Sequence, residues 1–138
     1  MTIDKSEIRD AATVIVLRDR DTEPTVLMGQ RGAQAAFMPS KFVFPGGAVD
    51  ETDADIPLAH PLPGLCSGRL CEDSRTDLSA ALAAAAIREL WEETGLILGV
   101  PGHWPGEVHA DWTGFAATGH LPSAEALQFV FRAITPPG

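Results

Sequence analysis

The sequence is poor in aromatic, basic and cysteine residues. It contains no tyrosine, three tryptophans, six phenylalanines and two cysteines. Ten Lys and Arg residues stand against 19 Asp and Glu residues, which gives a formal net charge of −9. Proteins that follow a phosphate backbone need clustered positive charge, so this balance argues against nucleic-acid binding. It is compatible with carboxylates gathered around a divalent cation.

Long apolar segments are also lacking. The longest apolar run covers residues 80–87, far fewer than the roughly 20 residues that cross a bilayer. The first ten residues are polar and lack the apolar core of a secretion signal. We therefore expect a cytoplasmic protein without membrane association, in which Cys66 and Cys71 are reduced. The 138 residues fit a single domain, residues 1–138.

Composition predicts three extended segments in the first third of the chain. Residues 11–18 and 25–30 are rich in β-branched and other apolar side chains, which favours two strands that pair as a hairpin. Residues 42–44 form a third, shorter extended piece that ends at a turn containing Gly46 and Gly47. Adjacent glycines let the backbone approach a ligand closely, so this turn is a candidate binding element.

The middle of the chain divides into a loop and a helix. Residues 50–75 contain three prolines, two glycines and no clear period, which predicts a long surface loop. The Ala-rich segment Asp77–Thr94 predicts a helix. Thr76 or Asp77 is the expected N-cap, and Gly95 the expected left-handed C-terminal cap.

The last third of the chain is harder to interpret. Residues 96–100 suggest the start of a strand. Residues 123–131 fit either a helix begun by a serine cap or a helical turn that leads into a strand, and we favour the helix. Residues 103–121 give no clear prediction.

The predicted helix carries one acidic face. At about 100° per residue, Glu89, Glu92 and Glu93 gather opposite the apolar stripe, and Arg88 borders them. Like charges at these spacings repel, and the helix C-terminus disfavours negative charge. A divalent cation such as Mg²⁺ or Mn²⁺ would reverse both effects, and Arg88 can orient one glutamate through a forked hydrogen bond. A lone pair of glutamates on a helix is, however, usually only a solvated face.

The residues around these glutamates resemble a known signature. The segment from Arg88 to Leu96 reads Arg-Glu-Leu-Trp-Glu-Glu-Thr-Gly-Leu and is similar to the second half of the Nudix signature, Arg-Glu-aliphatic-x-Glu-Glu-x-Gly-aliphatic. The preceding Phe44-Pro45-Gly46-Gly47 resembles the entry to that signature. Residues 131–136 are also similar to a segment found in a Nudix subgroup that includes a coenzyme A diphosphatase.

The spacing departs from the family pattern. Gly47 lies 41 residues before Arg88, where the family has 14, so about 27 residues are inserted. The early glutamate of the signature is expected eight residues before the arginine, where this chain has Ala80. We therefore expect this accessory acid to be absent unless Glu51 or Asp77 replaces it.

The resemblance implies an α/β fold, a Nudix-type α/β/α sandwich with a mixed sheet, and we expect its C-terminal strands to be lacking. It also implies Mg²⁺ or Mn²⁺ bound by Glu89, Glu92, Glu93 and the backbone of Gly47. Glu93, Glu92 and Arg88 are the expected catalytic residues. The implied activity is hydrolysis of the diphosphate linkage in a nucleoside diphosphate derivative, with coenzyme A derivatives, nucleotide sugars and dinucleotides all open.

Several assignments stay open. Gly46, Gly47 and Arg31 are candidates for substrate binding, with an ordinary surface arginine an equal alternative for Arg31. Asp111 and Glu107 are weak candidates for a further metal ligand, and Cys66, Cys71 and His60 have poor spacing for zinc. Two other functions compete with hydrolysis: an inactive Nudix-like binding module, and a structural unit that forms a homodimer through an exposed sheet edge.

Overall fold

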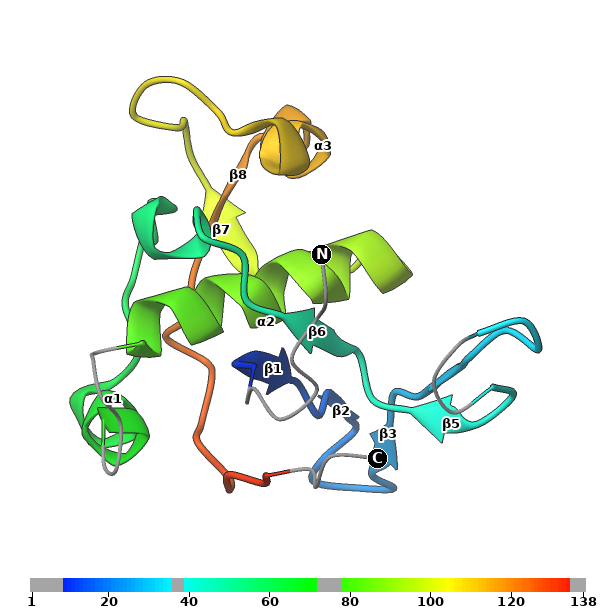
Figure 1. Cartoon of the computed structure of the whole chain (residues 1–138). Helices are drawn as coiled ribbons and strands as arrows, with labels where there is room; N and C mark the ends of the chain where they lie inside the picture. The colour runs from blue at the N-terminus through cyan, green and yellow to red at the C-terminus, as the bar shows by residue number, and fades with distance from the viewer. Residues whose placement is uncertain (1–8, 36–38, 72–77, 135–138) are drawn as a thin grey trace.

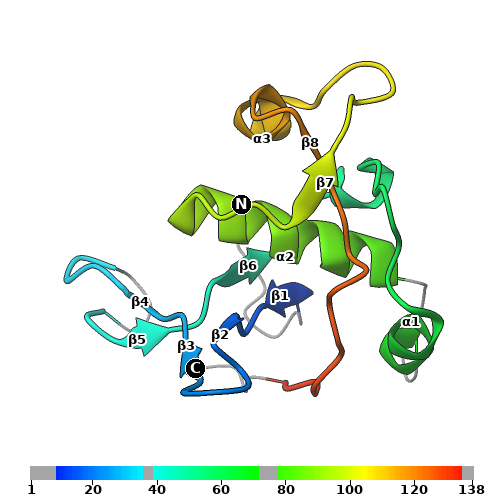
Figure 2. The ribbon, with the colours of Figure 1, turned by 180° about the vertical axis from the view of Figure 1, so that it is seen from behind.

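A computed structural model describes residues 9–35, 39–71 and 78–134. A single long helix, α2 (Ser79–Thr94), runs through the middle of the molecule (Figures 1 and 2). The predicted helix is confirmed, although it begins at Ser79, two residues later than expected. The proposed N-caps Thr76 and Asp77 lie outside the described residues.

The C-terminal end of α2 has the predicted cap. Gly95 adopts φ 76° in the left-handed region, and its N–H donates to the Trp91 carbonyl at 2.8 Å. Residues other than glycine rarely adopt this backbone conformation, because their Cβ approaches the carbonyl oxygen. The cap ends the helix directly after the acidic face and turns the chain back toward β7.

Short antiparallel strand pairs surround the helix. Strand β1 (Ala11–Thr13) pairs with β6 (Gly46–Ala48), and β2 (Leu17–Arg18) pairs with β3 (Thr25–Val26). Further along, β4 (Gly29–Gln30) pairs with β5 (Phe42–Val43), and β7 (Gly99–Pro101) with β8 (His120–Pro122). The predicted hairpin is confirmed as β2–β3, but the expected strand over residues 11–18 is interrupted between β1 and β2.

The strand pairs place a layer on each side of α2. The β1–β6 pair lies along one side, while β7, β8 and the short helix α3 (Thr113–Ala117) lie on the other (Figure 1). Two clusters of buried side chains correspond to these layers. One contains Ile87, Trp112 and Phe115 with neighbouring alanines, and the other contains Val14, Ala86 and Leu90. The alanines let neighbouring backbone come close to the helix.

The α/β class follows from this arrangement. Where a mixed sheet was expected, the described strands form four separate antiparallel pairs. Gly46 and Gly47 lie within β6, so the prediction that they form a turn is wrong. A Cβ on Gly46 would collide with the backbone of Ala12 and Thr13, which explains why glycine is needed there in a strand.

The inserted segment contains regular structure that its composition did not predict. The short 3₁₀-helix η1 (Asp53–Asp55) packs against α2, and α1 (Gly64–Cys71) forms a second helix. The buried thiol of Cys66 accepts a hydrogen bond from the Phe129 amide at 3.4 Å. The prediction of an irregular loop over residues 50–75 is therefore wrong for these two helices.

The helix favoured for residues 123–131 is also wrong. Backbone hydrogen bonds to distant residues keep the start of this region out of a helix. Ser123 N donates to Leu98 O at 3.2 Å, and Ala124 N donates to His60 O at 2.9 Å. One turn follows, closed by Leu127 N and Ala124 O at 3.1 Å. The alternative interpretation, a helical turn that leads into a strand, is met only by this turn, because residues 127–134 form neither helix nor strand.

In the described part of the chain, no helix is both long enough and apolar enough to cross a membrane.

We predict that Gly95→Ala lowers the free energy of unfolding by about 1–2 kcal/mol, because alanine is strained at this left-handed position. Gly68→Ala is the matched control. Gly68 lies within α1, a Cβ there meets nothing within 4 Å, and alanine favours helix by about 1 kcal/mol. Urea denaturation should therefore show opposite signs for the two variants, and equal effects would contradict the cap assignment.

Candidate active site

The centre of the site is the guanidinium group of Arg88, whose side chain is only 5% exposed. Its Nε donates to Oδ1 of Asp53 at 3.2 Å, and its Nη2 donates to Oδ2 of the same carboxylate at 3.1 Å. Nη2 also donates to the Ala48 carbonyl at 3.1 Å. One side chain thereby joins α2, η1 and β6. We call this group the Arg88 clamp.

Asp53 completes the clamp from the opposite side. Its side chain is 1% exposed, and Oδ2 also accepts the Asp50 amide hydrogen at 2.8 Å. The carboxylate of Asp50 lies 3.4 Å from Arg88 Nη2. A buried carboxylate needs such a set of donors, because an unpaired charge in the interior is strongly unfavourable. The beginning of the insertion is thus fixed to the helix.

Asp53 is a candidate for the accessory acid that the sequence analysis did not name. That acid was sought eight residues before Arg88, where the chain has Ala80, with Glu51 or Asp77 as substitutes. Glu51 is exposed, and Asp77 lies outside the described residues. The same family spacing, counted forward from Gly47 instead of backward from Arg88, gives position 53. Most of the inserted segment follows this position, so the forward count reaches Asp53 and the backward count does not.

The three glutamates differ in how firmly they are held. Glu89 Oε1 accepts from Arg88 Nη1 at 3.0 Å, and the Glu89 side chain is 17% exposed. Glu92 lies 3.6 Å from the same nitrogen and is 42% exposed. Glu93 is exposed. The orienting role predicted for Arg88 thus matches its contact with Glu89, while Glu92 and Glu93 keep freedom to change rotamer.

Gly47 creates the space in which Glu89 lies. A Cβ at position 47 would come within 2.5 Å of both Cδ and Oε1 of Glu89. The glycine therefore allows the Glu89 carboxylate to approach the backbone of β6. The close approach at Gly47 is therefore to a side chain of α2, and the predicted approach to a ligand stays a prediction.

The acidic face carries more negative charge than Arg88 neutralises. Burial raises the pKa of the Glu89 carboxyl, Arg88 lowers it, and the charges of Glu93 and Asp50 raise it again, with a net increase. Burial likewise raises the pKa of Glu92 against the influence of Arg88, with Glu89, Asp111 and Asp50 adding to the increase. Burial would lower the pKa of Arg88, but Asp53, Asp50 and Glu89 raise it overall.

The donor set suits a hard divalent cation, since it consists of carboxylate oxygens beside a strand backbone. Excess negative charge at Glu89 and Glu92 is the electrostatic condition that such an ion would relieve. Among the described residues, however, no three acidic, His or Cys side chains already converge closely enough to hold a metal ion. Closure around an ion would require Glu92 and Glu93 to swing toward Glu89, which their exposure permits.

Other predicted site residues lie at different distances from this face. Arg31 directly follows β4, on the arm formed by β4 and β5 that extends away from α2 in Figure 1. Asp111 lies on η2 (Ala110–Trp112) and acts on Glu92 through its charge.

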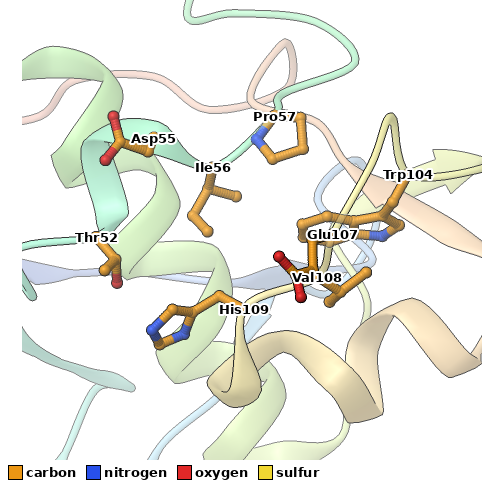
Figure 3. A pocket seen from close by; sticks show the side chains of 8 residues that line it. All are labelled: Thr52, Asp55, Ile56, Pro57, Trp104, Glu107, Val108 and His109. Atoms are coloured by element: carbon orange, nitrogen blue, oxygen red, sulfur yellow. The ribbon is translucent and has the colours of Figure 1, made fainter.

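Glu107 lines a separate cleft of about 430 Å³ beside η1 (Figure 3). Trp104 also lines this cleft, and Trp112 is buried in the core.

The chain is similar in sequence to known proteins. No family model matches the chain. It is 35% identical over 112 residues to the putative nudix hydrolase 7 of Caenorhabditis elegans, a match that covers 81% of this chain and 30% of that protein. It is 33% identical to the acyl-coenzyme A diphosphatase NUDT19 of Gallus gallus, with 72% of this chain and 32% of that protein covered.

A solved structure matches almost the whole chain. The crystal structure of a NUDIX hydrolase from Alicyclobacillus acidocaldarius superposes with a TM-score of 0.67 at 26% sequence identity, over 96% of this chain and 64% of that one. The chain belongs to the Nudix family.

The Nudix match confirms the fold class and the resemblance stated from the signature. The chain spans 30% and 32% of the length of the two curated Nudix relatives. The worm protein is named a putative nudix hydrolase, and the chicken protein is named an acyl-coenzyme A diphosphatase. The site residues themselves are assigned here from the signature and the geometry of the Arg88 clamp.

We predict that Asp53→Asn lowers the free energy of unfolding by about 3 kcal/mol, because it removes the charge of the most deeply buried carboxylate that pairs with Arg88 and leaves only the more exposed acids beside it. Asp55→Asn is the control, since Asp55 lies in the same 3₁₀-helix but is exposed. It should change stability by less than about 0.5 kcal/mol. Guanidinium denaturation measures both variants, and equal midpoints would show that the clamp contributes nothing.

Proposed function

We propose that this chain is a hydrolase dependent on Mg²⁺ or Mn²⁺ that cleaves the diphosphate linkage of a nucleoside diphosphate derivative. The observation that carries the proposal is the acidic face of α2, in which Arg88 fixes Glu89 beside Gly47 while Glu92 and Glu93 stay free to move. A structural role would not require acidic side chains to crowd at a helix C-terminus, where they reduce helix stability.

Each residue of the face has a separate role in this proposal. Glu89, Glu92 and Glu93, with the backbone of Gly47, hold the cation. A bound cation of this kind neutralises phosphate charge and lowers the pKa of water. Glu93 is the first choice for the base that accepts the proton of the attacking water, because it is exposed. Arg31, Gly46 and Gly47 are proposed to contact the substrate phosphates.

Coenzyme A derivatives are the substrates we propose first. Support comes from the similarity to a relative named acyl-coenzyme A diphosphatase, together with the related segment after the signature. This is an argument by analogy, because a shared fold accommodates many substrates. A panel of acyl-coenzyme A, nucleotide sugar and dinucleotide substrates, with products identified by mass spectrometry, distinguishes these classes.

We also propose that the chain acts in the cytoplasm as one domain and forms a homodimer. Val130, Phe131 and Ile134 support the last point, because each is at least 68% exposed. Clustered exposed apolar side chains often mark interfaces. Mass measurement in solution tests the dimer independently of activity.

An inactive Nudix-like binding module is the second candidate. It is favoured by the lack, among the described residues, of three side chains already converged on a metal position. Release of a phosphate-containing product with Mg²⁺, abolished by EDTA, supports the hydrolase. Ligand binding without such release under saturating Mg²⁺ supports the binding module.

We predict that Glu93→Gln reduces turnover by about 100-fold or more, which is the usual contribution of a general base. Because Glu93 is exposed, the thermal midpoint should stay within a few degrees of the parent protein. Glu23→Gln, an exposed acid in the β2–β3 turn, should retain full activity. Turnover close to normal in Glu93→Gln under saturating Mg²⁺ would remove Glu93 from the mechanism.

We further predict that Gly47→Ala impairs metal binding more than it impairs folding. The added methyl group displaces the Glu89 carboxylate, which is the end of a flexible side chain. The Mg²⁺ concentration that gives half-maximal activity should rise about tenfold. Gly29→Ala is the control, because Gly29 lies in β4 and a Cβ there meets nothing within 4 Å. If the Mg²⁺ dependence of activity is unchanged in both variants, Gly47 does not contribute to the cation site.

A further inference from the structure

A cleft lies beside the Arg88 clamp and has no role in the proposal above. One wall is formed within residues 52–57, at the start of the insertion, and the other within residues 104–109, between β7 and η2 (Figure 3). Its volume of about 430 Å³ is within the usual range of small-molecule sites, about 300–1,000 Å³. The Nudix insertion therefore helps to build a cleft as well as the clamp.

The walls of the cleft are partly apolar and partly acidic. Ile56, Val108 and Trp104 supply apolar surface, and Asp55 and Glu107 supply two carboxylates. None of the eight lining side chains is Lys or Arg. A phosphate group in this cleft would meet like charge without a cation to neutralise it, which is strongly unfavourable in a partly desolvated site. Carboxylates instead accept hydrogen bonds from N–H groups.

The aromatic wall is held rigidly. Trp104 Nε1 donates to the His120 carbonyl at 2.9 Å, which fixes the orientation of the indole ring. Its ring centroid lies 5.6 Å from that of Trp112, a residue that is 1% exposed. Because the ring is already fixed, little side-chain entropy is lost when a flat or apolar group of a ligand packs on it. Trp104 is therefore suited to contact a ligand while remaining attached to the core.

Both walls of the cleft adjoin in sequence a residue that acts on Arg88 or Glu92. Thr52 directly precedes Asp53, which is bound to Arg88. On the other wall, His109 Nδ1 accepts the Asp111 amide hydrogen at 3.2 Å, and Asp111 is the acid whose charge acts on Glu92. Thr52 and His109 lie toward one end in Figure 3, and Trp104 lies toward the other.

We infer that this cleft binds an uncharged, N–H-bearing end of the substrate and rejects an end that carries an additional phosphate. The inference rests on the proposed function, since the diphosphate must lie at the acidic face for the cleft to receive the adjoining group. When the His109 ring is neutral and Nδ1 accepts the Asp111 amide hydrogen, the ring proton lies on Nε2, which is then a hydrogen-bond donor. The accepted group is either a nucleobase ring or an amide chain.

Binding measured without metal tests the cleft separately from hydrolysis. We would titrate the full chain in EDTA with adenosine, pantetheine and adenosine 3′-phosphate, and follow heat by calorimetry. Adenosine represents the ring and pantetheine the amide chain. At least one of these two neutral probes should bind, and adenosine 3′-phosphate should bind at least about tenfold more weakly than adenosine if the ring is the occupant.

Charge reversal then identifies the residues responsible. Glu107→Lys and Asp55→Lys should each lower the affinity for the neutral probe by about tenfold. Each should also raise the affinity for adenosine 3′-phosphate relative to the affinity for the neutral probe. Both positions are exposed, so neither change should unfold the protein. Glu23→Lys makes the same change of charge at a remote turn and should leave all affinities within twofold.

The outcomes separate the two proposals. If neither neutral probe binds, or if Glu107→Lys and Glu23→Lys behave alike, the cleft assignment is overturned even when diphosphate hydrolysis is observed. If a neutral probe binds with the expected response to charge reversal but no diphosphate is hydrolysed, the cleft is a binding site and only the enzymatic proposal fails.

Discussion

The buried ion pair between Arg88 and Asp53 is the interaction on which this part of the molecule depends. A guanidinium group can be buried beside α2 only if nearby acceptors satisfy its donors, and Asp53, Ala48 and Glu89 together do so. Each acceptor comes from a different segment, so satisfying one side chain fixes three elements. Breaking such a pair is costly because the remaining charge stays buried, which makes the arrangement close to all-or-none.

The same ion pair links the insertion to the chemistry. It orients Glu89 directly, and through η1 it also positions the wall of the cleft that begins at Thr52. The acidic face and the cleft thus share one anchor, while Glu92 and Glu93 retain mobility at the exposed end of α2. A rigid base beside movable ligands is suited to a cation that must accept both protein and substrate oxygens.

Sequence reasoning predicted the elements whose signals are local. The alanine-rich run and Gly95 specified α2 and its cap, and the spacing from Arg88 to Leu96 indicated the family. Sequence reasoning failed where hydrogen bonds between residues far apart in the chain decide the structure. Residues 123–124 are bonded to Leu98 and His60, and α1 is bonded through Cys66 to residue 129. Asp53 was missed for a related reason, because an insertion of unknown position changes every count made backward across it.

The place of the insertion has a consequence for chain length. Asp53 is bound to Arg88 of α2, and most of the inserted residues come after Asp53 and before α2. They therefore form a loop whose two ends are fixed close together. The entropy lost by such a closed loop grows only logarithmically, at about 0.6 kcal/mol for each doubling of its length. The number of inserted residues should therefore have only a small effect on the free energy of unfolding, and the contact between Arg88 and Asp53 does not depend on it.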